Sequence, residues 1–479
     1  MAVGSSNSFD LVVLGAGNGG YAAAFRGAQL GLKVALIEQD KIGGTCLHRG
    51  CIPTKALIES AELFARLGKA KEFGLRLPGE VGVDYAQMAR RRDQVVKRMW
   101  TGLKTLVGKN KVEWIQGTGR LEAPTKVRVS LAGEDAAPGG GGERLLEATD
   151  LVIATGSRVK SLPGLEPDGQ RIVTSDDILR SDTRPASIAV VGAGAVGVEF
   201  ASMFHDLGSQ VTLLEYLPAI VPLEDADVSR ELERAFNRRG LRVMTNARFD
   251  PKAVEVTGDG VCLEVGPEGG PREELRVEQL LVATGRAPNV EGIGLERTRV
   301  ELERGFIKVD GRMRTRESHV YAVGDVVGGL MLAHTATHEG IIAAHAIAGE
   351  PIEEMDYDHQ PRATFSRPQV ASVGLTEQQA EAAGRRIKKA SFPFQADAKA
   401  VIGGEHEGFV KIVADADRDD VLGVHLIGPH VTDLIAEAAL AMTLGATAWE
   451  IAAATHPHPT LSEAVGEAAM LVDGRAINF

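Results

Sequence analysis

Short apolar runs alternate with helical patterns along the first two thirds of the chain. Residues 9–14 form an apolar run rich in β-forming side chains, and a helical pattern over 21–30 separates it from a second run at 33–37. The same order recurs later, with apolar runs at 187–191 and 210–214 on either side of another helix. Strands that alternate with helices in this way predict parallel sheets covered by helices, which is an α/β fold.

The loop that joins strand to helix has the pattern Gly-x-Gly-x-x-Gly in both places, at 15–20 and at 192–197. An acid ends the second strand of each copy, and it lies 23 residues after the first glycine (15 to Glu38, 192 to Glu215). Such glycines allow a tight turn, a close approach to a pyrophosphate and close helix packing, and the acid binds ribose hydroxyls. Equal spacing in two copies predicts an internal repeat of two dinucleotide-binding folds.

A second pair of matching segments closes each fold. Residues 151–157 (LVIATGS) are similar to 280–286 (LLVATGR), but the first copy is longer by 48 residues, since 141 residues separate Gly15 from Gly156 and 93 separate Gly192 from Gly285. The excess is accounted for by a cysteine-containing block and by a long polar helical stretch over 54–106. The cysteine block therefore belongs to the first fold.

From residue 353 onward the glycine patterns stop. Strands are expected at 362–372, 389–394, 408–414 and 422–427, and helices at 432–444 and 461–472, which form an α+β unit. Residues 112–129 are expected to form paired strands, and 132–143 a loop. The expected division is 1–156 and 285–352 for the first nucleotide domain, 157–284 for the second, and 353–479 for the C-terminal domain.

Composition narrows the classes of function. The net charge of −12 disfavours a nucleic-acid partner, because an acidic surface repels phosphates. Three cysteines in 479 residues do not make a disulfide framework, which indicates a reducing compartment. Neither a signal peptide nor an apolar run of the ~18 residues that a membrane helix needs is evident. We expect a cytoplasmic protein with no membrane association.

The block 43–55 (GGTCLHRGCIPTK) contains two of the three cysteines, Cys46 and Cys51. Zinc usually takes four ligands from two close pairs, and no second cysteine pair exists, so a metal site is the poorer interpretation. A dithiol that cycles with a disulfide needs two sulfurs and an electron carrier, which the nucleotide folds could supply. Two buried structural thiols remain the alternative.

A second candidate cluster, 456–463 (HPHPTLSE), lies near the C-terminus. A thiol attacks well at neutral pH when a base takes its proton, and a histidine of this cluster is such a base if a carboxylate fixes its tautomer. The alternatives without a catalytic role are that Thr460 and Glu463 form a helix capping box and that His458 is a surface side chain. A metal site on His456 and His458 lacks further ligands.

These motifs together resemble the flavoprotein pyridine nucleotide-disulfide oxidoreductase family, over residues 9–472. The run Cys-Ile-Pro-Thr-Lys resembles its dihydrolipoamide dehydrogenase branch. The resemblance implies FAD in the first fold and NAD in the second, with a C-terminal dimerisation domain. The implied FAD contacts are Gly15, Gly17, Gly20, Glu38, Gly44, Thr45, Lys55, Gly119, Thr155, Gly156, Asp325, Leu332, Ala333 and His334. The implied NAD contacts are Gly192, Gly194, Val196, Gly197, Glu199, Glu215 and Gly285.

Particular roles also follow from the resemblance. Asp325 contacts the ribityl chain of the flavin, although its bland alternative is a helix cap. Lys55 pairs with Glu199 beside the flavin, although Lys55 could be a plain surface amine. Glu215 favours NAD over NADP, because an acid repels a 2′-phosphate and no arginine follows it closely in sequence.

The implied reaction oxidises dihydrolipoyl groups and reduces NAD. His458, oriented by Glu463, deprotonates a substrate thiol, which attacks Cys46, while Cys51 passes electrons to the flavin. The family uses a homodimer in which the histidine serves the other subunit, and it serves lipoyl domains and the acyltransferase core of 2-oxo acid dehydrogenase complexes. Alternatives are another disulfide reductase, or a redox sensor that binds both cofactors without turnover.

Overall fold

The computed structural model describes residues 7–133 and 141–479. The chain forms two compact units, and each consists of three separate stretches of sequence. One unit comprises Met1–Ala56, Ala89–Lys160 and Arg286–Tyr357, and the other comprises Leu57–Met88, Ser161–Gly285 and Asp358–Phe479. The four-part division expected from the sequence stays a prediction. The loop expected at 132–143 lies largely outside the described residues.

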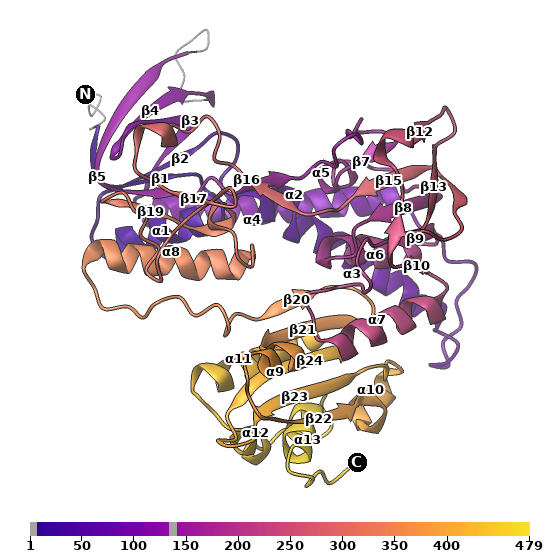
Figure 1. The fold of residues 1–479 in the computed structure, drawn as a ribbon. Helices are drawn as coiled ribbons and strands as arrows, with labels where there is room; N and C mark the ends of the chain where they lie inside the picture. The colour runs from indigo at the N-terminus through magenta and orange to yellow at the C-terminus, as the bar shows by residue number, and fades with distance from the viewer. Residues whose placement is uncertain (1–6, 134–140) are drawn as a thin grey trace. The chain divides into compact units, whose positions relative to one another are not determined.

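The first unit is built on a parallel sheet in the order β2-β1-β5-β19 (Figure 1). Its strands are β1 (Ser8–Leu14), β2 (Val34–Glu38), β5 (Glu143–Ile153) and β19 (Val320–Ala322), and α1 (Asn18–Gln29) connects β1 to β2. The apolar runs are buried on both faces of the sheet, as parallel strands require. The predicted strand, glycine loop and helix are confirmed here.

Two further strands extend this sheet. The expected pair at 112–129 is present as β3 (Glu113–Ala123) and β4 (Lys126–Leu131), which pair antiparallel. The start of β3 pairs in parallel with β2, and β4 pairs antiparallel with the start of β5. The α8 helix (Ala333–Ala348) lies beside α1 (Figure 1), where a Cβ on Gly340 would be 2.3 Å from the carbonyl oxygen of Gly19.

The prediction of one polar helical stretch over 54–106 is wrong, because this part of the chain is not a single helix. The structure has α2 (Gly44–Arg49), α3 (Cys51–Gly68) and α4 (Tyr85–Lys109), and residues 69–84 between the last two contain no regular helix. Pro78, Gly79 and Gly82 lie in that segment. Proline lacks an N–H to donate and glycine costs about 1 kcal/mol in a helix interior, so the helix is broken there.

The second unit contains the second glycine-loop fold. Its parallel sheet has the order β10-β9-β8-β15-β7, and α6 (Ala195–Asp206) follows β8. A small antiparallel sheet and the α7 helix complete the fold. The elements are β7 (Ile172–Val173), β8 (Ser187–Val191), β9 (Gln210–Leu214), α7 (Ala226–Arg239), β10 (Arg242–Met244), β11 (Ala247–Arg248), β12 (Glu255–Val256), β13 (Val261–Pro267), β14 (Glu273–Val277) and β15 (Gln279–Val282).

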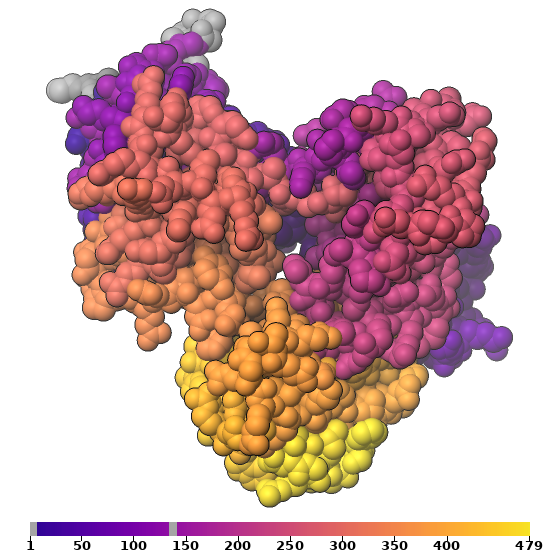
Figure 2. Space-filling model, viewed as in Figure 1, coloured from indigo at the N-terminus to yellow at the C-terminus, as the bar shows by residue number. Residues whose placement is uncertain are grey.

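The same unit holds a five-stranded antiparallel sheet of order β20-β21-β24-β23-β22. The strand expected over 362–372 is two strands with a turn at 365–368, where Pro368 cannot donate a ladder hydrogen bond. Residues of this part are yellow to orange in Figure 2. Its elements are β20 (Arg362–Thr364), β21 (Gln369–Gly374), α9 (Glu377–Ala382), β22 (Ile387–Pro393), α10 (Ala398–Gly403), β23 (Phe409–Asp415), β24 (Val421–Gly428), α11 (Val431–Thr443), α12 (Ala448–Ala453) and α13 (Glu463–Leu471).

Five short strands and α-helices remain in the described parts of the two units. They are β6 (Ser157–Val159), α5 (Ser175–Ile178), β16 (Arg286–Pro288), β17 (Leu302–Glu303) and β18 (Phe306–Ile307). Among the described residues, every helix is too short or too polar to cross a bilayer. The predicted fold class, two Rossmann-like domains and an α+β C-terminal domain, is confirmed.

Candidate active site and nucleotide sites

The structure shows a different environment for each of the three glycines of the first loop. Gly15 has φ of +103°, and a Cβ on it would be 2.3 Å from the carbonyl oxygen of Ala154 at the end of β5. A Cβ on Gly20 would be 1.9 Å from the oxygen of Gly15. A Cβ on Gly17, in contrast, meets no protein atom within 4 Å. The fold itself therefore requires the first and third glycines, and the middle one faces open space at the N-terminus of α1.

The second loop repeats this arrangement closely. Gly192 has φ of +101°, and its added Cβ would be 2.5 Å from the oxygen of Ala283. The added Cβ of Gly197 would be 1.8 Å from the oxygen of Gly192, and that of Gly194 has nothing within 4 Å. Both helix N-termini thus offer free amides and room for a pyrophosphate, which fits one dinucleotide in each fold.

The two acids are held in matching positions. Glu38 accepts the N–H of Ala16 at 2.8 Å on one carboxylate oxygen and that of Asp40 at 2.9 Å on the other. Glu215 likewise accepts the N–H of Ala193 at 2.7 Å and of Leu217 at 2.8 Å. A carboxylate has about four acceptor positions, so each acid keeps capacity for ribose hydroxyls.

An arginine that sequence spacing did not reveal lies beside Glu215. Arg248 at the end of β11 stacks on the ring of Tyr216 with its guanidinium carbon 3.4 Å from the ring centroid. It also donates to the carbonyl oxygen of Tyr216 at 2.6 Å and lies 3.5 Å from Glu268. No arginine follows Glu215 closely in sequence, but the fold brings Arg248 next to Tyr216.

The cysteine block is tied to the first glycine loop. The N–H of Gly43 donates to the oxygen of Ala16 at 2.8 Å, and a Cβ on Gly44 would be 2.8 Å from the Cα of Gly17. Gly43 and Gly44 have φ of +106° and +57°, which glycine adopts without strain. The block therefore lies against the loop that is predicted to bind FAD.

The two sulfurs lie together at the junction of α2 and α3. Cys46 is in α2 and Cys51 is the first residue of α3. A hydrogen bond to Cys51, burial and the nearby charge of Cys51 raise the pKa of Cys46, while the ammonium of Lys55 acts in the opposite direction. A Cβ on Gly50 would be 3.0 Å from the oxygen of Thr45, so this glycine allows the close approach of the two helices. One thiolate at a time is the state that this pairing favours.

Tyr21 is a neighbour of both sulfurs that the sequence did not indicate. Burial raises the pKa of the Tyr21 phenol, and negative charge on Cys46 or Cys51 raises it further. Its hydroxyl accepts a hydrogen bond from the Nδ2 of Asn18 at 2.9 Å. The first turn of α1 thus forms one wall of the dithiol site.

The carboxyl ends of β5 and β19 gather the other predicted FAD residues. The Thr155 hydroxyl donates to the oxygen of Asn289 at 2.7 Å, and Asn289 donates its N–H to Gly156 at 2.9 Å. Asp325 accepts a short hydrogen bond from Ser157, and burial raises the pKa of its carboxyl. Asn289 and Ser157 were missed because residues of these types occur in many loops.

A buried acid supports the loop of Asp325. Glu339 on α8 is 2% exposed and accepts the N–H of Gly324 at 2.6 Å and the hydroxyl of Tyr357 at 2.8 Å. Burial raises the pKa of Glu339 to about 7. Gly324 has φ of +78°, so the loop needs glycine at this position.

The remaining predicted cofactor residues lie in different surroundings, in the core, at a helix start or within a helix. Gly119 faces the core, since its added Cβ would be 2.5 Å from Leu14, so the chain itself requires it. Leu332 caps α8 and the next two residues, Ala333 and His334, begin this helix. Glu199 is buried in α6 and accepts the N–H of Phe365 at 2.9 Å.

The predicted base and acid lie together. The Nδ1 of His458 is 2.9 Å from Glu463, whose other carboxylate oxygen accepts the N–H of Thr460 at 2.8 Å. Burial opposes ionisation of Glu463, but the hydrogen bonds from Thr460 and His458 and the nearby histidine charges outweigh it and lower the pKa. The capping interaction and the dyad therefore coexist in one carboxylate. The His458–Pro459 peptide bond is cis.

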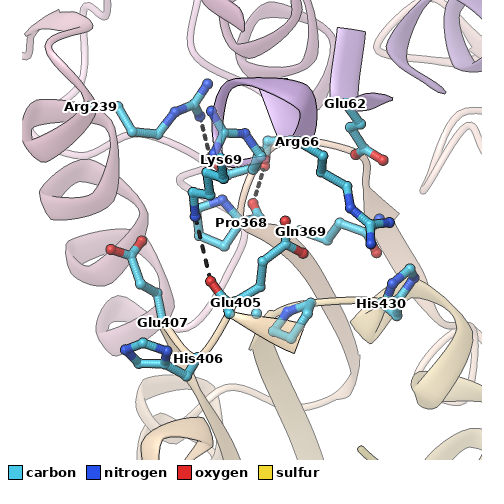
Figure 3. A pocket seen from close by; sticks show the side chains of 15 residues that line it. Glu62, Arg66, Lys69, Arg239, Pro368, Gln369, Glu405, His406, Glu407 and His430 are labelled. Carbon is cyan, nitrogen blue, oxygen red and sulfur yellow. Dashed lines mark hydrogen bonds between the residues drawn. The ribbon is translucent and has the colours of Figure 1, made fainter. Parts of the chain in front are cut away.

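A pocket of about 290 Å³ that includes several charged side chains lies elsewhere in the second unit (Figure 3). Arg66 and Lys69 of α3 line it, together with Arg239 at the end of α7 and His430. Lys69 donates to the oxygen of Gly404 at 3.4 Å. Its described lining includes none of the predicted catalytic or cofactor residues.

Comparison with known proteins identifies the class. Residues 9–340 match the family model "Pyridine nucleotide-disulphide oxidoreductase", and residues 360–469 match the dimerisation domain of the same family. The chain belongs to the pyridine nucleotide-disulphide oxidoreductase family.

Individual relatives narrow the comparison. The chain is 46% identical to the dihydrolipoyl dehydrogenase of Bacillus subtilis, covering 99% of this chain and 100% of the relative, and 43% identical to that of Zymomonas mobilis over 99% and 100%. The crystal structure of LpdA from Mycobacterium tuberculosis superimposes with a TM-score of 0.87 at 30% identity, covering 97% of this chain and 99% of that one.

Proposed function

We propose that the protein is a dihydrolipoyl dehydrogenase, a flavoprotein that oxidises protein-bound dihydrolipoyl groups and reduces NAD⁺ to NADH. The observation that carries this proposal is the cysteine pair lying against one of two glycine loops that are each shaped for a dinucleotide. Full-length similarity to dihydrolipoyl dehydrogenases supports the choice of substrate.

The chemistry of the chain itself is thiol–disulfide exchange. His458 accepts a proton from one substrate thiol, and the resulting thiolate attacks the Sγ of Cys46. Both cysteines are free thiols in the structure, and in the oxidised form proposed here the Cys46–Cys51 disulfide bond breaks as Cys51 leaves as a thiolate. The second substrate thiol then attacks the substrate sulfur of the mixed disulfide, and Cys46 leaves and takes up the proton of that thiol. Two electrons pass from the substrate to the cysteine pair, and the substrate leaves as a cyclic disulfide.

Glu463 serves this step by holding His458 in one tautomer and by stabilising the imidazolium that forms. The ammonium of Lys55 favours a thiolate in the pair, because it opposes the rise in the pKa of Cys46 that the hydrogen bond to Cys51 and burial cause. Tyr21 in the first turn of α1 lies near enough for negative charge on either sulfur to raise the pKa of its phenol.

When bound, FAD would supply the two-electron redox chemistry that links the dithiol to NAD⁺. Gly17, Glu38, Gly156 and Asp325 would hold FAD, because they surround the open carboxyl end of the first sheet. Gly194 and Glu215 would hold NAD in the second fold. The acid at Glu215 favours the nucleotide without a 2′-phosphate.

The active unit is proposed to be a homodimer, in which His458 of one subunit serves Cys46 and Cys51 of the other. The match of residues 360–469 to a dimerisation domain supports the dimer. The side chain of His458 is 71% exposed, which is suited to a base that acts beyond its own domain. Lipoyl domains and the acyltransferase core of a 2-oxo acid dehydrogenase complex are the proposed partners, and the cytoplasm stays the predicted location.

The decisive experiment measures NADH formation by the purified flavoprotein with dihydrolipoamide. We expect turnover with NAD⁺, little with NADP⁺, and loss of turnover in Cys46→Ser and Cys51→Ser. Oxidised glutathione and mercuric ions are the competing substrates. Faster reduction of either one, with no lipoamide activity, would reject the proposal in favour of another disulfide reductase.

A further inference from the structure

A second histidine–carboxylate pair lies next to the proposed base and has no role in the mechanism above. The Nε2 of His456 is 2.7 Å from the Oε1 of Glu437 on α11, and the His456 side chain is 11% exposed. Two residues later, His458 is 71% exposed. The loop between α12 and α13 therefore has one buried imidazole and one projecting imidazole.

The buried imidazole is confined from a second side. Gly466 on α13 faces its ring, and a Cβ at this position would be 2.8 Å from the Nδ1 of His456 and 2.9 Å from its Cε1. The ring is thus held between a carboxylate of α11 and the backbone of α13. The loop beyond His458 is held separately, because the Thr460 hydroxyl donates to the oxygen of Pro457 at 2.7 Å and its N–H donates to Glu463.

We propose that His456 and Glu437 are positioning residues for the His458–Glu463 dyad. The inference rests on the proposed function, since it assigns a task to residues beside the proposed base. The projecting imidazole is largely exposed and is held by Glu463, so its position also depends on the backbone on either side of His458. His456 anchors the preceding side, and Thr460 anchors the following side. His456 also lies close enough for its charge to lower the pKa of Glu463.

Two substitutions of His456 test the anchor directly. Displacement of a reacting group by about 1 Å can cost roughly 100-fold in rate. We expect His456→Ala to lower lipoamide-dependent kcat about 10- to 100-fold. His456→Gln retains a donor for Glu437, and we expect it to recover most of the activity. Glu437→Gln should give an intermediate loss.

A substitution on the opposite helix tests the same idea without changing either residue of the pair. Gly466→Ala places its Cβ within 2.8 Å of the His456 ring, so the imidazole must shift. Alanine in a helix is more favourable than glycine by about 1 kcal/mol, so its effect should fall on activity more than on folding. Gly102→Ala on α4 is the matched control, because its added Cβ meets nothing within 4 Å.

The readout is the ratio of two activities of the same protein. Transfer from NADH to ferricyanide, a one-electron acceptor that takes electrons from the flavin, uses neither the cysteines nor His458. A positioning role predicts that His456→Ala and Gly466→Ala lose lipoamide activity while the ferricyanide activity and the melting temperature change little. Parallel loss of both activities, or unchanged lipoamide activity in both variants, would overturn the inference. Absence of lipoamide activity in the wild-type protein would instead reject the proposed function.

Discussion

The middle glycine of each loop can be substituted without a clash inside the protein, so its substitution tests ligand binding separately from folding. Alanine at Gly17 adds a Cβ with no protein atom within 4 Å, whereas alanine at Gly20 places one 1.9 Å from the oxygen of Gly15. We therefore expect Gly17→Ala to fold normally without binding FAD well. Gly20→Ala should push α1 away from β1 and lower stability as well.

The size of the binding effect follows from the contacts that the methyl group would prevent. A hydrogen bond to a charged group contributes about 1.5–3 kcal/mol. Loss of one amide contact to the pyrophosphate should therefore weaken FAD binding roughly 10- to 150-fold. The same reasoning applies to Gly194→Ala and NAD, because the added Cβ of Gly194 also meets no protein atom within 4 Å.

The two variants should fail in different assays. Gly17→Ala should be purified with a reduced ratio of 450 nm flavin absorbance to protein, and added FAD should restore activity at high concentration. Gly194→Ala should keep its flavin and show a raised KM for NAD⁺. Full flavin content in Gly17→Ala, or an unchanged KM in Gly194→Ala, would refute the assignment of these open spaces to the two nucleotides.

Three further substitutions test other parts of the structure. Glu463→Gln keeps the size of the side chain but removes the charge beside His458, and lipoamide turnover should fall about 10-fold or more while NADH–ferricyanide activity persists. Lys411→Met removes the buried cation beside Asp225, whose carboxylate keeps its backbone hydrogen bonds from Asp227 and Glu377 but loses its counter-ion. The free energy of unfolding in urea should therefore fall by about 3–5 kcal/mol, unlike that of the exposed control Lys399→Met. Burial raises the pKa of Glu339 from its ordinary 4.5 to about 7, so the folded chain holds this proton more tightly and loses stability as pH rises between those values. Glu339→Gln should lack this loss, and its melting temperature relative to wild type should rise from pH 5 to pH 8; a constant difference would contradict the shift.

The repeated nucleotide folds were predictable because their signals are local. The glycine spacing, the flanking apolar runs and the acids at 38 and 215 each act within one strand–helix–strand unit. The pairing of His458 with Glu463 was predictable for the same reason, since five residues and a helix start separate them.

The interactions that the sequence did not reveal join distant segments. Thr155 bonds to Asn289, and His456 bonds to Glu437 across a helix and a loop. Asparagine and glutamate are common residues, and no spacing rule connects such partners before the sheet order is known. Arg248 was missed in the same way, because β11 reaches Tyr216 only through the fold of the second unit.

The near identity of the two glycine loops has a consequence for how the protein tells its ligands apart. Turn, helix start and acid have matching geometry in the two copies, and we expect them to bind the adenosine diphosphate portion that both coenzymes share. Discrimination between FAD and NAD must then come from the residues around each glycine loop. In the first fold Gly44 closes over Gly17 and brings the sulfurs with it. The cysteine segment therefore packs on one of the two similar loops, and this is the first structural difference between the expected FAD site and the expected NAD site.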